Sequence, residues 1–417
     1  MRIVVRSPDA RRARPLVERL ESAGLEATAL VGPAARRSAP GGEDVTILDG
    51  ADPAQAIAFA QNLRDDGAPS LALVGACASD APPPSVAARL DAWADLESAP
   101  ETIGRRINRV FRDGVLSAEV VARARTAESL NLAPPLVTTD YNQPASVLFV
   151  GCPTPSFLAL QRAMQTWGGR MGATFTSFSA FDHVHDDQFD ALVLFGGDDA
   201  GPALSLIAAL RRNSSLHDMP AYFLGESEDD RALALERGVD EAMQPRFEAP
   251  KAALWLIEDI RRARLRRALM RALDAPIAAP DEAFAFFGRH LAGLAQTHHD
   301  RGRPLSLAVL EANSAAIGAP AWRKGFDDIL NLTSRLTRAS DSVAPIDGQR
   351  IVLAFPSTYS GGAAAALQRV VSVCECTAFA AGDGLGAPVR LSYRVAELSP
   401  GESGAGLLSR AMLARAA

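Results

Sequence analysis

Residues 338–358 read RASDSVAPIDGQRIVLAFPST. Arg338 and Asp341 stand three positions apart, a spacing that places both side chains on one face of a helical turn. An Asp-Gly dipeptide at 347–348 follows, and this dipeptide is typical of tight hairpins. Residues 351–355 are then continuously apolar, which predicts a buried strand. The stretch therefore predicts a helix end, a hairpin and a core strand in series.

The sequence around this stretch predicts a mixed α/β domain over residues 274–417. The expected elements are an amphipathic helix at 284–294, a strand at 305–310, a helix at 363–373 and a strand near 390–395.

This arrangement resembles the GGDEF domain of diguanylate cyclases. In that family an Arg-x-x-Asp inhibitory site lies five residues ahead of a Gly-Gly-Asp-Glu-Phe hairpin. Here five residues separate Asp341 from the hairpin sequence DGQRI at 347–351. The resemblance implies a nucleotidyl cyclase-like α/β fold, in which the inhibitory motif is kept and the catalytic motif is lost.

Cyclase chemistry needs carboxylates that hold two Mg²⁺ ions against the nucleotide triphosphate. At the family's acidic hairpin positions this chain has Gln349 and Arg350, and Glu311 and Asn313 end the strand before the nucleotide loop. That loop, residues 314–320, offers no clear polar contacts for a base or phosphate. We therefore expect no catalytic residue, no required metal and no cyclase activity.

The inhibitory-type site is a different matter. A guanidinium matches O6 and N7 of guanine, and a carboxylate accepts from N1–H and N2–H₂, so Arg338 and Asp341 together fit one guanine. In the family a second arginine completes the site, and Arg369 stands 31 residues after Arg338 on the predicted following helix. We expect cyclic di-GMP as the ligand of these three residues. The alternative is an ordinary ion pair on a helix surface.

The first half of the chain contains an internal repeat of about 145 residues. Apolar runs at 3–5, 45–48 and 71–74 are answered by runs at 147–150, 189–195 and 221–224. Strands that alternate with helical stretches predict doubly wound parallel sheets. We expect domains at 1–125 and 145–273, a proline-bearing linker at 126–144, and the third domain at 274–417.

Both copies resemble receiver domains of response regulators, which have a flavodoxin-like fold. Asp49 matches the phosphoacceptor position, but Ser7 and Pro8 replace the acidic pair that would bind Mg²⁺. Gly75 stands at the hydroxyl position and Ala99 at the lysine position. Asp49 is thus a possible phosphoacceptor or a strand-end aspartate that caps a turn.

The second copy has Phe195-Gly196 at the acceptor position, so we expect it to act as an adaptor or dimerisation surface. The apolar stripe of residues 252–273 is either a partner surface or intramolecular core.

Composition narrows the function classes. A net charge of -6 argues against nucleic-acid binding, and four scattered cysteines fit a reducing cytosol. No apolar run approaches the ~20 residues that span a bilayer. We expect a cytoplasmic protein without membrane insertion.

The complete order resembles PleD-like response regulators, and in particular their catalytically inactive cyclic di-GMP effectors. That resemblance implies a homodimer through the receiver domains, recruitment to a cell pole, and assembly of an adaptor complex that delivers cell-cycle regulators to the ClpXP protease. The competing hypothesis is a phosphorylation-driven signalling scaffold that has lost nucleotide binding.

Overall fold

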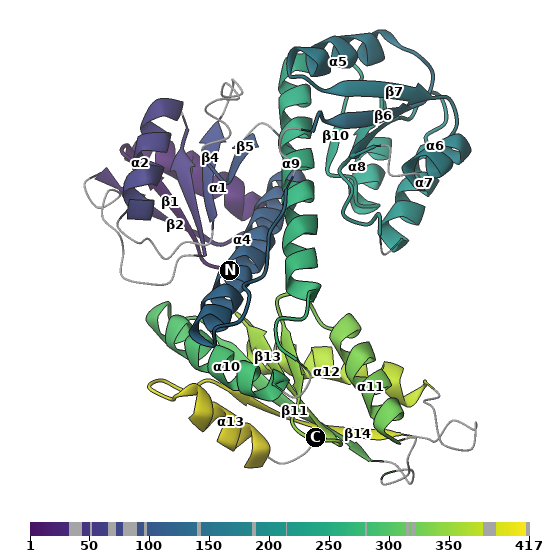
Figure 1. The fold of residues 1–417 in the computed structure, drawn as a ribbon. Coiled ribbons are helices and arrows are strands. Elements are labelled where there is room, and N and C mark those ends of the chain that lie inside the picture. Colours follow the sequence, from purple (N-terminus) through teal and green to yellow (C-terminus); the bar gives the residue numbers. More distant parts are fainter. Residues whose placement is uncertain are drawn as a thin grey trace. The chain divides into compact units, whose positions relative to one another are not determined.

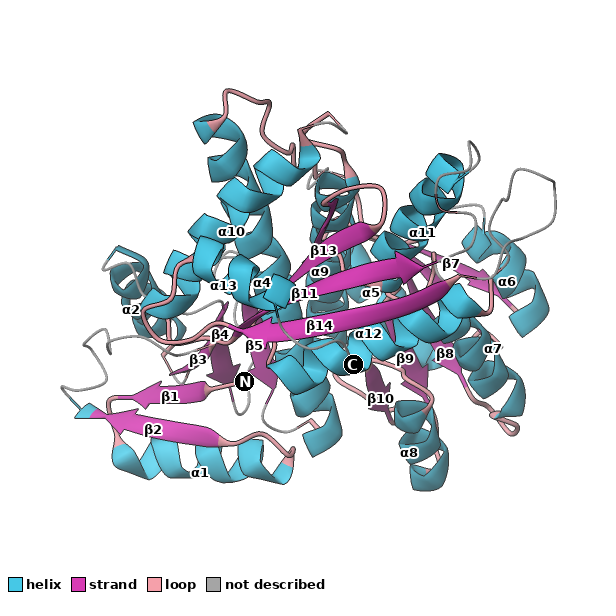
Figure 2. Cartoon of the chain, turned by 90° about the horizontal axis from the view of Figure 1, so that it is seen from below, coloured by secondary structure: helices cyan, strands magenta, loops and turns pink. Residues whose placement is uncertain are grey.

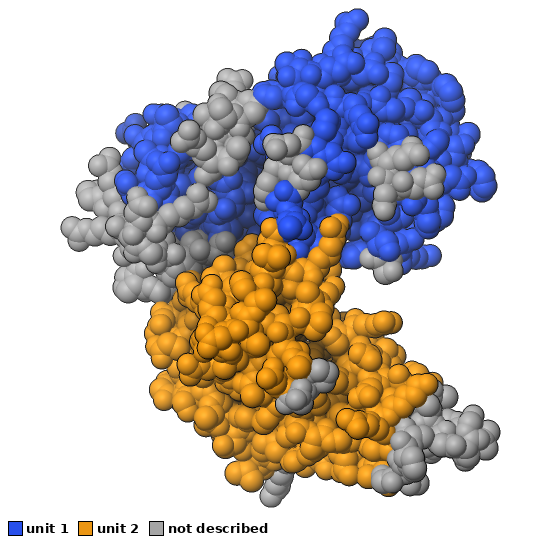
Figure 3. Space-filling view, viewed as in Figure 1, with its two compact units in different colours: residues 1–114, 138–268 blue, residues 115–137, 269–417 orange. Residues whose placement is uncertain are grey.

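The structure, a computed structural model, divides into two compact units (Figure 3). The first comprises residues 1–114 and 138–268, and the second comprises residues 115–137 and 269–417. The residues that the structure describes are 1–32, 44–50, 52–65, 72–77, 90–95, 98–139, 143–185, 189–213, 215–279, 282–313, 317, 322–377 and 389–413.

The first unit begins with a five-stranded parallel sheet of strand order β2-β1-β3-β4-β5 (Figure 1). This is the flavodoxin-like order, which receiver domains share. Its strands are β1 (Ile3–Ser7), β2 (Ala27–Val31), β3 (Val45–Asp49), β4 (Ala72–Cys77) and β5 (Ala92–Asp95). Its helices are α1 (Ala10–Ser22), α2 (Pro53–Asp65) and α4 (Pro100–Ser129), of which the last continues into the second unit.

The second sheet repeats the same topology, because its order β10-β9-β8-β6-β7 is the first order read in reverse. Its strands are β6 (Ser146–Val150), β7 (Arg170–Thr174), β8 (Ala191–Phe195), β9 (Ala221–Leu224) and β10 (Glu241–Met243). Its helices are α5 (Pro155–Thr166), α6 (Ser177–His185), α7 (Gly201–Arg212), α8 (Glu228–Glu236) and α9 (Ala249–Asp274). The predicted repeat and fold class are confirmed.

Local sequence explains where these helices begin. Thr154 caps α5 by accepting a hydrogen bond from the Phe157 amide, and Pro155 takes the first helical position, where its missing N–H is not needed. Ser227 caps α8 in the same way.

Helix α9 settles the alternatives left open for residues 252–273. Leu254, Ile257 and Ile260 are buried in a core shared with both parallel sheets, and so are Trp255 and Leu256. These side chains are covered by strands of the same chain, which leaves no room for a partner protein at this part of the helix. In the first unit the stripe is therefore intramolecular core.

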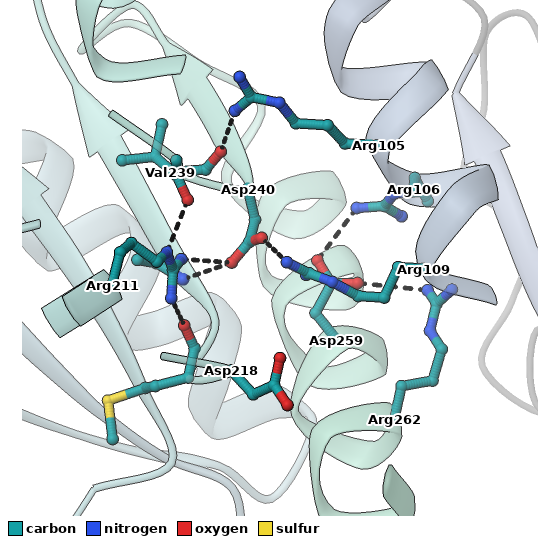
Figure 4. A network of polar contacts seen from close by, with 12 residues as sticks. Arg105, Arg106, Arg109, Arg211, Asp218, Val239, Asp240, Asp259 and Arg262 are labelled. Carbon is teal, nitrogen blue, oxygen red and sulfur yellow. Dashed lines mark hydrogen bonds and ion pairs between the residues drawn. The ribbon is translucent and has the colours of Figure 1, made fainter. Parts of the chain in front are cut away.

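Buried ion pairs also join the two receiver-like halves of the first unit (Figure 4). Arg106 of α4 lies 3.1 Å from the Asp259 carboxylate of α9, and the Tyr222 hydroxyl donates to the same carboxylate at 2.8 Å. Arg109, one helical turn further along α4, pairs with Asp240 ahead of β10. The two halves are thus connected by polar as well as apolar contacts.

The second unit contains an antiparallel four-stranded sheet of order β12-β13-β11-β14 (Figure 2). The strands are β11 (Leu305–Asn313), β12 (Ser342–Pro345), β13 (Arg350–Pro356) and β14 (Arg390–Glu397). The helices are α10 (Ala283–Asp300), α11 (Trp322–Leu336), α12 (Ser360–Glu375) and α13 (Gly404–Leu413). The helix and strand order expected for residues 274–417 is confirmed.

Both faces of this sheet are covered, and strand periodicity decides which side chain goes where. Leu307 and Val309 of β11 pack with α10 and α13, whereas Ala308 and Leu310 pack with α11 and α12. Successive strand residues point to opposite faces, so a strand buried on both sides is continuously apolar.

The predicted linker at 126–144 begins inside α4, which ends at Ser129. Of the helices described, none is both long and apolar enough to cross a bilayer.

Candidate ligand-binding site

The residues of the Arg-x-x-Asp motif form a hydrogen-bonded turn after α11 has ended. The Asp341 amide donates to the Arg338 carbonyl at 2.8 Å, and the Asp341 Oδ2 atom accepts from the Arg338 amide at 2.9 Å. The expected helical turn is therefore wrong. The physical reason is that a short aspartate side chain competes for backbone N–H groups and favours turns over helices.

The two side chains of the motif differ in exposure. The Arg338 side chain is exposed, whereas Asp341 is only 7% exposed. The Asp341 Oδ1 atom is buried and has no hydrogen-bond partner among the described residues. Burial raises the pKa of Asp341 to about 6, although the Arg338 amide and the charges of Arg338 and Arg123 act in the opposite direction. An unsatisfied buried carboxylate oxygen is costly to the folded state.

Arg369 comes to the same place from α12. Its Nη2 atom donates to the carbonyl of Leu336, the last residue of α11, at 2.8 Å. The side chain of Arg369 is exposed, like that of Arg338. The structure thus brings the three predicted residues to the carboxyl end of α11, with two exposed guanidinium groups.

Sequence reasoning missed a fourth contributor, Arg123 of α4. Its Nη2 atom donates to the Asp341 carbonyl at 3.0 Å and lies 3.4 Å from the Ala339 carbonyl. Its Nε atom pairs with Glu119 at 2.7 Å. More than 200 residues separate this arginine from the turn, so no local pattern in the sequence indicates the contact.

Glu119 is the acceptor at the centre of this cluster. Besides Arg123, the Nε2 atom of His290 donates to its Oε1 atom at 2.9 Å, and the Ser342 hydroxyl does so at 3.2 Å. Burial alone would raise the pKa of Glu119, but the charges and hydrogen bonds of His290 and Arg123 outweigh it and lower the pKa to about 2. Glu119 therefore carries a buried negative charge.

The hairpin at 346–349 is held by the carboxylate of Asp347 and by a contact from α11. The Asp347 carboxylate accepts from the Gln349 and Arg350 amides and pairs with the Arg350 guanidinium at 2.6 Å. The Trp322 indole N–H donates to the Gly348 carbonyl at 2.8 Å. The Asp347 carboxylate and the Gly348 carbonyl thus both have partners within the protein.

The carboxylate at the end of β11, beside the hairpin, also has a partner. Glu311 pairs with Arg394 of β14 at 3.0 Å. The expected nucleotide loop at 314–320 lies outside the described residues apart from Ile317. Within the described ranges, no group of three or more His, Cys, Asp and Glu side chains is arranged to hold a metal ion.

In the first sheet, Asp49 ends β3 beside a cavity of about 200 Å³. The Ser7 hydroxyl donates to its carboxylate at 2.8 Å, and the Arg12 Nε atom lies 3.3 Å away. Asp9, which directly follows Ser7 and Pro8 at the positions of the acidic pair, instead caps α1 by accepting from the Arg11 amide. A guanidinium rather than an acidic metal site therefore faces Asp49.

The missing hydroxyl at Gly75 has a packing explanation. Trp93 of β5 is fully buried, and a Cβ atom on Gly75 would come within 2.4 Å of its ring. The same indole lies 2.7 Å from where a Cβ on Gly50 would be. Two glycines are needed here because the tryptophan occupies the space of their side chains.

Comparison with known proteins gave matches among solved structures only. No protein-family profile matches the sequence, and no curated protein matches it either. The GGDEF domain of YfiN (TpbB) from Pseudomonas aeruginosa is 18% identical, with a TM-score of 0.29, over 31% of this chain and 84% of that chain.

Two other matches come from different organisms. The GGDEF domain of DgcB from Caulobacter crescentus, solved in complex with c-di-GMP, is 18% identical over 31% of this chain and 77% of that chain, with a TM-score of 0.27. The chemotaxis response regulator CheY4 of Vibrio cholerae is 16% identical over 27% of this chain and 93% of that chain, with a TM-score of 0.24. The fold assignments above rest on strand order and register.

Proposed function

We propose that this protein is a non-enzymatic cyclic di-GMP effector that binds the dinucleotide at Arg338, Asp341 and Arg369. The observation that carries the proposal is the meeting of the 338–341 turn and Arg369 at the end of α11, with both guanidinium groups exposed. The bond of Arg369 to the Leu336 carbonyl, two residues before Arg338, supports a shared surface for residues 31 positions apart in sequence.

The chemistry of this surface fits a guanine nucleotide with phosphate charges. A planar guanidinium binds O6 and N7 of guanine in a bidentate manner, and a carboxylate such as that of Asp341 accepts from N1–H and N2–H₂. Arg338 and Arg369 together offset the two phosphate charges of cyclic di-GMP and offer planar faces for stacking on a base. Binding of this kind requires no metal ion.

The hairpin supports a role without catalysis. Arg350 puts a permanent positive charge where a cyclase needs a metal-binding carboxylate, and that charge is paired with Asp347. Glu311, the remaining carboxylate, is paired with Arg394. We expect no cyclic di-GMP when the purified protein is incubated with GTP and Mg²⁺, and a detected product would overturn this part of the proposal.

The wider role that we propose is that of an adaptor of the PopA type, a degenerate PleD-like response regulator. Occupancy by cyclic di-GMP would control recruitment to a cell pole and assembly with protein partners that deliver cell-cycle regulators to the ClpXP protease. A homodimer through the receiver-like domains belongs to the same proposal. The surfaces that carry Arg106 and Arg109 already serve the pairing within one chain, so a dimer would use another face.

Calorimetry with cyclic di-GMP tests the binding proposal. We expect heat of binding for the native protein, and a loss of affinity of at least about tenfold for Arg338→Ala, because charge-assisted hydrogen bonds are lost. Arg335→Ala is the matched control, since Arg335 is an exposed arginine one turn earlier on α11. No heat with the native protein would refute the proposal, and equal affinity in Arg338→Ala would refute the site.

A second candidate is a phosphorylation-driven scaffold, which the position of Asp49 at the carboxyl end of β3 beside a cavity favours. Incubation with acetyl phosphate and Mg²⁺, followed by intact-mass analysis, distinguishes it. A gain of one phosphoryl group in the native protein but not in Asp49→Asn would support the scaffold. An unchanged mass, together with cyclic di-GMP binding, would exclude it in favour of the effector.

A further inference from the structure

We infer that Arg123 of α4 is a positioning residue for the ligand site: it holds the 338–341 turn in the form that reads guanine, and α4 thereby senses occupancy. The inference rests on the proposed cyclic di-GMP binding and adds a residue and an element that the inhibitory motif does not contain.

The geometry of the Arg123 guanidinium supports this role. Its Nη1 atom donates to the Leu273 carbonyl at 2.9 Å, at the end of α9, and its Nη2 atom donates to the Asp341 carbonyl at 3.0 Å. The Nε atom pairs with Glu119. The side chain is 11% exposed. One planar group with five donors in a fixed fork thus ties the turn to two helices.

The contacts order the backbone of the turn and do not use its carboxylate. Among the hydrogen bonds that Arg123 donates, the acceptors on the turn are the carbonyls of Ala339 and Asp341 and the Ser342 hydroxyl, not the Asp341 carboxylate. The Oδ1 atom of Asp341 has no partner in the described part of the chain. The backbone of the turn is thus already ordered, although a ligand donor must displace the groups that bury the Oδ1 atom.

Arg123 also contributes to the field at Asp341. The charged groups that face this carboxyl are Arg338 from its own turn and Glu119 and Arg123 from α4, and His290 of α10 contacts Glu119. The positive charges of Arg338 and Arg123 lower the pKa of Asp341, and Glu119 raises it. Removal of Arg123 therefore raises the pKa of Asp341 and favours the protonated form, which accepts poorly from guanine.

Coupling between the turn and α4 is reciprocal. If the contacts of Arg123 favour ligand binding, the bound ligand must stabilise those contacts by the same free energy. Residues 115–129 of α4 belong to the second unit, and residues 100–114 of the same continuous helix carry Arg106 and Arg109 in the first. Ligand occupancy is thus expected to change the dynamics of α4.

The test uses calorimetry with cyclic di-GMP across pH 5 to 8 on three full-length variants. Arg123→Ala should weaken binding about tenfold and move the midpoint of the pH profile upward. Arg123→Lys should keep the midpoint near that of the native protein, because the charge remains, while it loses affinity with the planar fork. Arg125→Ala is the matched control, because Arg125 is exposed on the same helix and has no hydrogen bond to a described residue.

Hydrogen exchange measures whether the ligand protects the amides of α4, an effect that is not expected if Arg123 only stabilises the fold. Cyclic di-GMP should increase amide protection over residues 115–129 in the native protein and in Arg125→Ala, and not in Arg123→Ala. If Arg123→Ala fails to fold, as judged by circular dichroism and thermal melting, the comparison of Arg123→Lys with Arg125→Ala decides the same question.

The outcomes separate the two proposals. Absence of binding in the native protein refutes the proposed function and this inference together. Binding in the native protein, with the same affinity, midpoint and protection pattern in Arg123→Ala as in Arg125→Ala, overturns the inference about Arg123 alone.

Discussion

At the scale of single residues, the proposed binding of cyclic di-GMP at Asp341 should depend on pH. Its pKa is raised from 3.8 to about 6, chiefly by burial, and only the ionised carboxylate accepts two hydrogen bonds from guanine. A ligand that binds the ionised form loses affinity as pH falls through that pKa, by up to ~10-fold per pH unit below it. We predict a nearly constant affinity for cyclic di-GMP above pH 7 and a steep loss between pH 6 and 5, measured by calorimetry.

Asp341→Asn is the control for this prediction. An amide does not titrate, so the variant should bind weakly and with little pH dependence over the same range. A pH profile in Asp341→Asn that parallels that of the native protein would show that another group is responsible.

Arg369 provides a second prediction at this scale. Its guanidinium is exposed and donates to the Leu336 carbonyl, so its removal should cost the fold less than about 0.5 kcal/mol. We expect Arg369→Ala to lower cyclic di-GMP affinity by ~10-fold while the thermal melt stays unchanged. Gln368→Ala, the preceding exposed position on α12, should change neither quantity. A drop in melting temperature with affinity retained would assign Arg369 a structural role instead.

At the scale of elements, α11 supports the hairpin through Trp322. The indole N–H donates to the Gly348 carbonyl, and the ring is 8% exposed. Trp322→Phe keeps most of the packing and removes the hydrogen bond, so the free energy of unfolding should fall by about 1 kcal/mol. Urea denaturation measures the change, and Arg323→Ala, an exposed neighbour, should leave it within about 0.5 kcal/mol. An equal loss in both variants would argue against a specific role for the indole.

Helices and strands were predictable where the local pattern of apolar residues decides between them. The alternation of β11 between two covered faces appears in sequence as the apolar run 307–310, and β13 and α12 were expected close to their observed bounds. The repeat of the two parallel sheets was visible in the sequence because their buried strands give corresponding apolar runs. Arg369 was expected to complete a site with Arg338, and its guanidinium donates to the carbonyl of Leu336, two residues before Arg338.

Contacts between distant segments could not be predicted in this way. The bond from Arg123 to the turn, and that from Trp322 to the hairpin, join side chains to backbone carbonyls, which exist at every residue and leave no pattern. The helical turn expected at Arg338 was wrong because the side chain of Asp341 bonds the backbone in competition with the helix. Apolar periodicity alone could not separate a partner surface from the enclosed core around α9.

At the scale of the whole molecule, buried ion pairs hold the receiver-like halves together. Asp259 accepts from Arg106 and from the Tyr222 hydroxyl, and its side chain is 4% exposed. Asp259→Ala would leave the Arg106 charge buried without its partner, so we predict a loss of about 3–5 kcal/mol in the free energy of unfolding. Glu18→Ala breaks the exposed pair of Arg14 and Glu18 and should cost less than about 0.5 kcal/mol. Similar losses in both variants, measured by denaturant titration, would contradict this assignment.

Two further carboxyls of the first unit make its stability depend on pH. Burial raises the pKa of Glu241 and of Glu258 from 4.5 to about 7, and the negative charges around Glu241 add to the effect. The Oε2 atom of Glu258 has no hydrogen bond within the described residues, and the Arg262 Nη2 atom is 3.7 Å away. The folded state therefore holds protons that the unfolded chain has already released above pH 4.5.

The sign of the effect follows from that difference. Between pH 4.5 and 7 the folded protein binds more protons than the unfolded chain at these two sites, so they make stability fall as pH rises, and their contribution levels off above pH 7. His298 belongs to the second unit, and burial lowers its pKa to about 4, so its effect on the stability of the chain has the opposite sign. The difference in melting temperature between the native protein and a variant removes that effect. We predict that Glu241→Gln with Glu258→Gln melts at a higher temperature than the native protein at pH 7.5, and that this gap narrows steadily toward pH 5. A gap that is constant with pH, or that widens as pH falls, would show that both carboxyls are already ionised in the folded protein.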